Sequence, residues 1–207
     1  MPLDDVGRRQ AEVAARALAQ LAPSRIVSSD LSRAFDTASE LSRITGVDIQ
    51  VDERLRETHA GTWEGKTRSE IEVEQPSGLA AWAGGSDMRP GGGERRSEVA
   101  ARMLAAIDSA LQGVDDDGVL VVATHGGSAR AAIGSLLELP VAHWGILGVL
   151  SNCAWCVLSE TGGPAATLAD VTSTASSEYP DVPPTPPWRL VEYNAASLPT
   201  VAIGDDS

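Results

Sequence analysis

The stretch VLVVATHGGSARAAIG, residues 119–134, joins a short apolar segment to a histidine and then to a segment with helical spacing. Residues 119–123 are apolar and mostly β-branched, which is typical of a strand buried at the centre of a sheet. His125 and two glycines follow, so the imidazole is expected at the carboxyl edge of the sheet, beside a helix N-terminus. Open α/β sheets bind ligands at that edge, and helix N-termini attract anions. The stretch therefore predicts that His125, with the backbone at Gly126, contacts a phosphate group.

Strand-like and helix-like segments alternate along most of the chain. Strands are predicted at residues 25–29, 47–53, 119–123, 152–158 and 188–193. Helices are predicted at residues 5–21, 30–45, 95–112 and 127–139. This alternation indicates an α/β fold, a three-layer α/β/α sandwich with a mostly parallel sheet. The 207 residues are enough for one domain, 1–207, in which the segment 160–187, rich in Pro, Ser and Thr, is expected to be a flexible loop.

The composition excludes several classes of partner. A net charge of −13 disfavours contact with nucleic acid or with an anionic membrane surface, because both need a basic protein surface. The chain has no run of about 20 apolar residues, and its first residues lack a signal-peptide core, so we expect a cytoplasmic protein. The two cysteines lie in a predicted strand and the three histidines are scattered, so no metal site is predicted. An anionic substrate stays compatible with this charge if a few arginines converge.

Two further charged side chains follow predicted strands. Arg33 lies in the first turn of helix 30–45, where its guanidinium can fork onto phosphate oxygens. Glu57 follows the strand at 47–53, and Arg56 beside it is equally well placed to contact an anionic substrate or to lie on the surface. Taken alone, Arg33 is better interpreted as a solvated helix residue and Glu57 as a surface carboxylate, and His125 is equally well interpreted as a ligand-binding or as a structural histidine. Because the carboxyl ends of parallel strands meet at one edge of a sheet, we expect both to converge with His125 on one pocket.

Three motifs strengthen this interpretation when they are taken together. SSDLSRAFDTA (28–38), LRETHAGTWEG (55–65) and ATHGG (123–127), in this order and spacing, resemble the histidine phosphatase superfamily, which has the phosphoglycerate mutase-like fold. RLRETH, GGGE, ELPVAHW and WRLVEYNAAS resemble more closely the actinobacterial glucosyl-3-phosphoglycerate phosphatases.

The resemblance implies a phosphomonoesterase that needs no cofactor and no metal. In this family a histidine attacks phosphorus, and two arginines and a second histidine hold the phosphoryl oxygens. A glutamate protonates the leaving oxygen and then takes a proton from water. By their positions in the motifs, Arg33 matches the second arginine, His125 the second histidine and Glu57 the acid/base. The implied substrate is a small phosphorylated metabolite, with glucosyl-3-phosphoglycerate or a related ester as the best candidate, and a homodimer is left open.

The sequence departs from the family in one respect. The attacking histidine of the family lies in an Arg-His-Gly motif after the first strand, and these 207 residues contain no such motif. The first residues resemble the stretch that follows this motif, so we expect that about 25–30 residues, a strand and a long loop, are absent. We favour a start codon assigned too late over a truncated paralogue, and we expect the strands at 25–29 and 119–123 to have unpaired edges where the absent strand belongs. Without the nucleophile, residues 1–207 are predicted to have no normal turnover.

Two alternatives remain at this point. The first is a non-catalytic module that binds phosphate or mediates dimerisation. The second is a phosphoglycerate mutase-like enzyme, which we disfavour because mutases of this family carry a longer insertion after the glutamate loop. Here only a short segment separates Glu57 from the glycine-rich break near residue 91.

Overall fold

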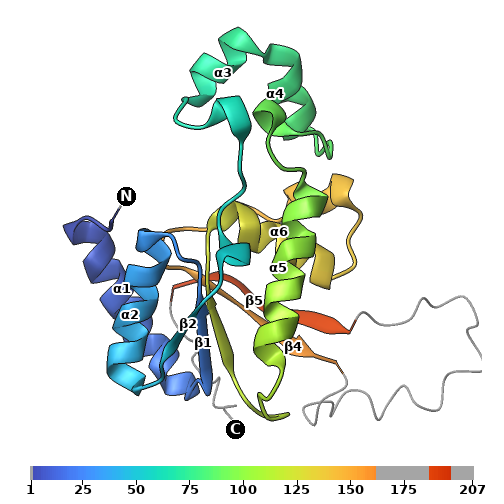
Figure 1. The fold of residues 1–207 in the computed structure, drawn as a ribbon. Helices are drawn as coiled ribbons and strands as arrows, with labels where there is room; N and C mark the ends of the chain where they lie inside the picture. Colours follow the sequence, from blue (N-terminus) through green and yellow to red (C-terminus); the bar gives the residue numbers. More distant parts are fainter. Residues whose placement is uncertain (1, 162–186, 197–207) are drawn as a thin grey trace, which may run out of the picture.

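The computed structural model describes residues 2–161 and 187–196, and Figure 1 shows the path of the chain. The strands are β1 (Arg25–Ser28), β2 (Ile49–Val51), β3 (Leu120–Ala123), β4 (Trp155–Glu160) and β5 (Trp188–Ala195). The α-helices are α1 (Asp5–Leu18), α2 (Ser32–Thr45), α3 (Arg68–Glu74), α4 (Pro76–Ala83), α5 (Arg96–Leu111) and α6 (Gly126–Leu136). Short 3-10 turns are η1 (Ala19–Leu21), η2 (Glu53–Leu55), η3 (Gly61–Trp63), η4 (Pro90–Gly92) and η5 (Val141–Ile146). Most of the segment predicted as a loop, 160–187, falls outside the described residues.

A parallel sheet with the strand order β2-β1-β3 lies between two layers of helices (Figure 1). Neighbouring residues of β1 face opposite layers, as the period of a strand requires. Ile26 packs with Ala38 and Leu41 against the layer of α1 and α2. Val27 packs with Met103 and other residues of the layer of α5 and α6. The predicted three-layer α/β/α arrangement is therefore confirmed.

The edges of the sheet differ in part from the expectation. β1 is paired on both sides, Ile26 with Ile49 of β2 and with Val121 of β3, so the unpaired edge expected for residues 25–29 is wrong. β3 was expected at the centre of the sheet, but it is the outer strand and all four of its residues are only half-buried. Within the described residues no strand pairs with its second edge, but β1 and β3 pair directly with each other, so the gap expected in the sheet interior for an absent strand is not observed.

The remaining strands, β4 and β5, form a separate antiparallel pair. Cys153 precedes β4 and only Cys156 lies in it, so the predicted strand at 152–158 begins later than expected. Both thiols are free.

Local sequence explains where the helices begin and end. The Asp4 carboxylate accepts a hydrogen bond from the Gly7 amide at 2.7 Å and so caps the start of α1. Gly46 ends α2 with a φ of +74°, a conformation that glycine adopts without steric cost. The Thr67 and Glu70 side chains form a capping box at the start of α3. In the described part of the chain, no helix is both long and apolar enough to cross a membrane.

The segment between β2 and α5 forms a small excursion that stands beyond the carboxyl ends of the parallel strands, at the top of Figure 1. It contains α3 and α4 and has its own apolar cluster, which includes Trp63, Ile71 and Leu79. The loop that carries Glu57 leads into this excursion. The carboxyl edge of the sheet is thereby covered on one side.

Candidate active site

His125 lies directly after β3 and is the residue that precedes the first turn of α6. Its side chain is buried, and its Nε2 lies 3.0 Å from the hydroxyl of Ser29, which follows β1 and is also buried. The Ser29 hydroxyl in addition accepts a hydrogen bond from the Leu31 amide at 3.3 Å. The Ser29 hydroxyl can donate to Nε2 or accept from it, so this contact fits either tautomer of the imidazole.

The electrostatics of this position favour the neutral imidazole. Burial, together with the positive charge of Arg33, lowers the pKa of His125 from 6.5 to about 4, although the negative charge of Glu57 acts in the opposite direction. Arg33 is exposed in the first turn of α2, as the sequence predicts. Arg33 and His125 lie at the same edge of the sheet, where a cation beside an imidazole can bind an anion.

Glu57 caps the N-terminus of α6. Its carboxylate accepts hydrogen bonds from the amides of Gly127 at 3.0 Å, Ser128 at 2.9 Å and Thr58 at 2.8 Å. Burial raises the pKa of Glu57, but these amides and the charge of His125 outweigh it, so the pKa of the Glu57 carboxyl lies below its usual range. The anion at the helix N-terminus next to His125 is the Glu57 carboxylate, and the phosphate contact predicted there stays a prediction.

Glycine is required at one of the two positions that follow His125. A Cβ at Gly127 would lie 2.5 Å from Oε1 of Glu57, whereas a Cβ at Gly126 would meet no atom within 4 Å. Gly127 thus makes room for the carboxylate that caps the helix. The space at Gly126 is consistent with the predicted phosphate contact at its backbone, which stays a prediction.

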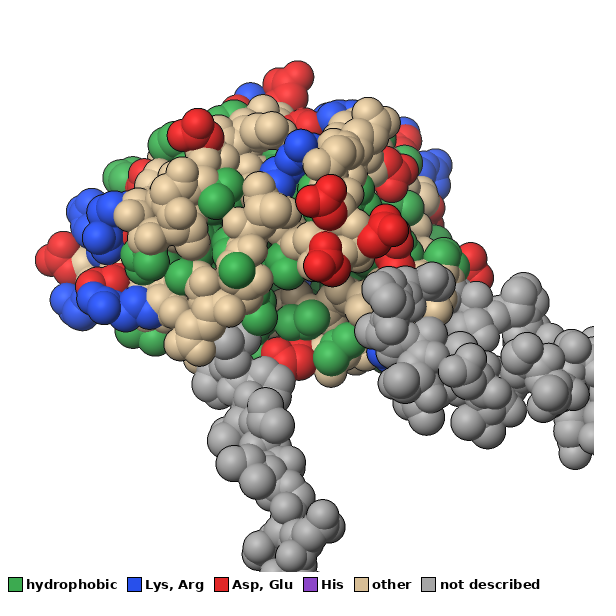
Figure 2. Space-filling view, turned by 90° about the horizontal axis from the view of Figure 1, so that it is seen from below, with side chains coloured by type: hydrophobic (Ala, Val, Ile, Leu, Met, Phe, Trp, Pro, Cys, Tyr) green, Lys and Arg blue, Asp and Glu red, His purple; other side chains and the backbone are tan. Residues whose placement is uncertain are grey.

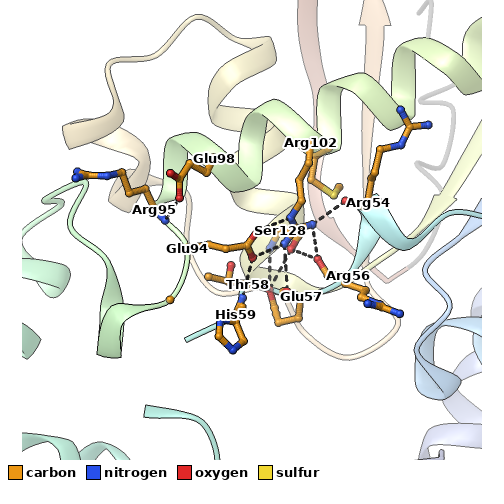
Figure 3. Close-up of polar contacts among 12 residues, drawn as sticks. Arg54, Arg56, Glu57, Thr58, His59, Glu94, Arg95, Glu98, Arg102 and Ser128 are labelled. Atoms are coloured by element: carbon orange, nitrogen blue, oxygen red, sulfur yellow. Dashed lines mark hydrogen bonds and ion pairs between the residues drawn. The ribbon is translucent and has the colours of Figure 1, made fainter. Parts of the chain in front are cut away.

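Figure 3 shows the polar network that holds the loop of Glu57. The guanidinium of Arg102, on α5, donates to the backbone carbonyls of Arg54 and Arg56, both at 2.7 Å, and of Glu57 at 3.2 Å. It also makes a two-point contact with the carboxylate of Glu94, at 2.8 and 2.9 Å.

The same network extends to the start of the excursion. Glu94 accepts a hydrogen bond from the His59 amide at 2.9 Å, so the segment on both sides of Glu57 is tied to one ion pair. Sequence reasoning assigned no role to Arg102. Two features of the sequence indicate this role weakly. Arg102 lies on an otherwise apolar face of the predicted helix, and Glu94 directly follows a glycine turn.

The structure gives Arg56 a carboxylate partner. Its guanidinium donates from Nε to Asp30 at 2.8 Å and lies 3.6 Å from Glu53. Asp30 belongs to the link between β1 and α2. This exposed ion pair therefore joins the start of α2, which carries Arg33, to the loop that carries Glu57. The contact to substrate predicted for Arg56 would compete with that pair.

Arg33, Glu57 and His125 therefore occupy the same end of the molecule, since each follows a strand of one parallel sheet. Figure 2 views the molecule from the opposite end, where acidic, basic and apolar side chains are mixed and no histidine is visible. Within the described residues, no group of three or more His, Cys, Asp or Glu side chains is placed to hold a metal ion. The chemistry that this end can perform thus rests on arginine, histidine and glutamate side chains.

Comparison with known proteins decides the family. The model of the histidine phosphatase superfamily (branch 1) matches residues 1–170. The chain belongs to the histidine phosphatase superfamily. The fold, the resemblance and the class of activity predicted from the sequence, a phosphomonoesterase, are confirmed at this level.

Individual relatives agree with this assignment. Glucosyl-3-phosphoglycerate phosphatase of Mycobacterium tuberculosis is 38% identical over 202 residues, which cover 94% of this chain and 84% of the relative. A probable phosphoglycerate mutase of Yersinia pestis is 32% identical over 154 residues, covering 74% of this chain and 71% of the relative. The solved structure of a mycobacterial glucosyl-3-phosphoglycerate phosphatase with inorganic phosphate superimposes with a TM-score of 0.77 at 36% identity, covering 94% of this chain and 87% of that one. This histidine phosphatase is thus similar along most of its length to enzymes that act on small phosphate esters.

Proposed function

We propose that this histidine phosphatase hydrolyses the phosphate ester of a small metabolite, with glucosyl-3-phosphoglycerate or a related phosphoglycerate ester as the best candidate. The observation that carries the proposal is the placement of Glu57 and His125 together at the N-terminus of α6, with Arg33 at the same edge of the sheet. The name of the 38% identical mycobacterial relative supports the choice of ester. The compartment that fits a small soluble substrate is the cytoplasm.

In this proposal each of the three residues has a separate role. Arg33 and His125 hold the phosphoryl oxygens, where negative charge develops as the ester bond breaks. Glu57 protonates the oxygen of the leaving group. Its carboxyl is held ionised in the free protein, but a phosphate dianion beside it raises its pKa, because two like charges disfavour each other. Substrate binding therefore loads Glu57 with the proton that it donates.

The attacking histidine is proposed to come from a segment outside residues 1–207. His59 is exposed and lies 3.5 Å from Glu64, and His143 is exposed in η5. Neither follows a strand of the parallel sheet. The genomic sequence upstream of Met1 tests this point directly: an in-frame apolar strand followed by Arg-His-Gly is expected. A stop codon or an unrelated sequence there would instead favour a non-catalytic phosphate-binding module.

The roles are tested in the chain extended by that upstream segment. Two substrates are compared, glucosyl-3-phosphoglycerate, whose alkoxide leaves poorly, and p-nitrophenyl phosphate, whose leaving group departs without a proton. Glu57→Gln is expected to lower kcat/KM by about 100-fold for the first substrate and much less for the second. An equal loss with both substrates would exclude Glu57 as the general acid.

Arg33 provides the matched comparison. Arg33→Ala removes a contact to the phosphoryl group and not to the leaving group, so both substrates should lose the same factor in kcat/KM. Arg33→Lys should restore this only in part, because an ammonium group cannot reproduce the planar fork of a guanidinium. Selective loss with the sugar ester alone would place Arg33 on the leaving group and contradict its proposed role.

A further inference from the structure

A cleft opens beside Glu57, on the side of the excursion. Its cavity volume is about 50 Å³, and the space beyond that is open to solvent. Two of its lining residues, Thr58 and Gly127, are among the three residues whose amides donate to the Glu57 carboxylate. The other lining residues are Trp82, Arg96, Arg130, Ala131, Trp144 and Gly145. Glu57 itself does not line the cleft, which therefore lies next to the group that would protonate the leaving oxygen, separated from it by the backbone at Thr58 and Gly127.

Two arginines line this cleft without a carboxylate partner. Within the described residues no Asp or Glu oxygen lies within 4 Å of the guanidinium of either Arg96 or Arg130. Arg130 has one long hydrogen bond, from Nε to the Gly126 carbonyl at 3.4 Å. Burial lowers the pKa of Arg96 and the negative charge of Asp87 acts against this, but the Asp87 carboxylate accepts its hydrogen bonds from the amide and the hydroxyl of Ser97.

The two guanidinium groups also act on each other. Arg96 is half-buried, and this burial, with the positive charge of Arg130, lowers its pKa. Arginine nevertheless keeps its charge at neutral pH, so the repulsion persists in the free protein. An anion between the two groups would replace that repulsion with two attractions. In a chain with a net charge of −13, two unpaired arginines in one cleft are a local exception.

Aromatic side chains form the walls. Arg96 stacks on the ring of Trp82 at 3.8 Å from its centroid and donates to the Trp82 carbonyl at 2.7 Å, which fixes both groups. Trp144 is buried against Gly134, where a Cβ would lie 2.6 Å from the indole ring. Arg96 is thus held in place, whereas Arg130 keeps only its long bond to Gly126, and two cations between flat apolar walls fit a ligand with a carboxylate and a compact carbon body.

We propose that this cleft binds the leaving group of the substrate, with Arg96 and Arg130 holding a carboxylate such as that of a glycerate. The inference rests on the proposed function, because it takes the general acid Glu57 as the point where the leaving oxygen lies. It makes the two arginines specificity-determining residues for esters that carry a carboxylate near the phosphate.

Binding to residues 1–207 tests the proposal without turnover. Isothermal titration calorimetry compares 3-phosphoglycerate with glycerol 3-phosphate, which has a hydroxymethyl group in place of the carboxylate. The wild-type chain is expected to bind 3-phosphoglycerate more tightly than glycerol 3-phosphate. Arg130→Gln should lower the affinity for 3-phosphoglycerate by about 10-fold and leave the affinity for glycerol 3-phosphate unchanged. Arg96→Gln should act in the same direction. Arg9→Gln, which removes an exposed charge on α1, should change neither affinity.

The outcomes separate the inference from the proposed function. Equal affinity for the two ligands, or equal loss of both in Arg130→Gln, would overturn the carboxylate site and leave the phosphatase proposal standing. Failure of the chain extended by the upstream segment to bind either phosphate ester or orthophosphate would contradict both. Thermal unfolding of each variant identifies any loss of affinity that comes from loss of the fold. Arg130→Lys, which keeps the positive charge, should retain part of the preference for 3-phosphoglycerate.

Discussion

Lowering the pH from 6.5 toward 4 is expected to destabilise the folded chain through His125. In the unfolded chain the imidazole takes up a proton below its ordinary pKa of 6.5, whereas burial and the charge of Arg33 delay protonation in the fold until about pH 4. Between these values the unfolded state binds more protons, so the free energy of unfolding falls as the pH falls. At about 1.36 kcal/mol per pKa unit, the loss amounts to roughly 3 kcal/mol by pH 4. Below that pH no further loss comes from this group.

Urea unfolding at several pH values between 4 and 6.5 measures this effect. The comparison is the wild-type chain against His125→Gln, in which the carboxylates still titrate but the imidazole does not. The difference between the two free energies should change with pH across this window and be constant above it. His59→Gln, which replaces an exposed ring, is the matched control and should behave as the wild-type chain does. Parallel pH profiles of the wild-type chain and His125→Gln would refute the reasoning.

The same electrostatics link phosphate binding to protons. A phosphate dianion beside His125 would offset the charge of Arg33 and raise the pKa of the imidazole. Sulfate, which is a dianion at about pH 6 and does not itself titrate there, should bind with proton uptake, which calorimetry in buffers of different ionisation enthalpy detects. Because Glu57 also takes up a proton when an anion binds, the uptake in the wild-type chain is compared with that in His125→Gln and should be larger. Equal uptake in the two chains would argue against a contact between His125 and the anion.

Two other substitutions test the support of Glu57. Gly127→Ala places a Cβ 2.5 Å from Oε1 of Glu57 and so displaces that carboxylate, and in the extended chain it should slow hydrolysis of sugar phosphates more than that of p-nitrophenyl phosphate. Gly126→Ala has the space it needs and should not show that selectivity. Arg102→Gln leaves the half-buried Glu94 carboxylate without its partner and three carbonyls without their donor, and should lower the free energy of unfolding by roughly 2–4 kcal/mol in urea. Arg16→Gln, which breaks an exposed ion pair on α1, should cost less than about 1 kcal/mol, and equal losses would contradict the role given to Arg102.

The layered fold and the position of the site could be predicted from local patterns. The run 119–123 followed by His125 and two glycines specifies a strand, a turn and a helix start, and the structure has β3 and α6 there. Since the strands are parallel, residues that follow them meet at one edge, and this placed Arg33 and Glu57 with His125. These inferences need only the local sequence and the geometry of a parallel sheet.

Contacts between distant segments could not be predicted in this way. The neighbours of a strand depend on the path of the chain through the sheet, so the pairing of β1 with both β2 and β3 was missed. Arg102 contacts carbonyls 45 to 48 positions earlier in the chain, and no periodicity reports such a contact. Arg96 and Arg130 come together from different helices, and Glu57 reaches an amide 70 positions away. Each of these depends on how α5, α6 and the segment after β2 pack together.

Titration with orthophosphate tests most directly the central claim, that Arg33, Glu57 and His125 surround a phosphoryl group. Isothermal titration calorimetry of residues 1–207 should give one phosphate site, and Arg33→Ala should weaken it by about 10-fold or more, since a charge-assisted hydrogen bond to phosphate is lost. Arg9→Ala removes an exposed arginine from α1 and should leave the affinity unchanged. Equal phosphate affinity of the wild-type chain and Arg33→Ala would contradict the account.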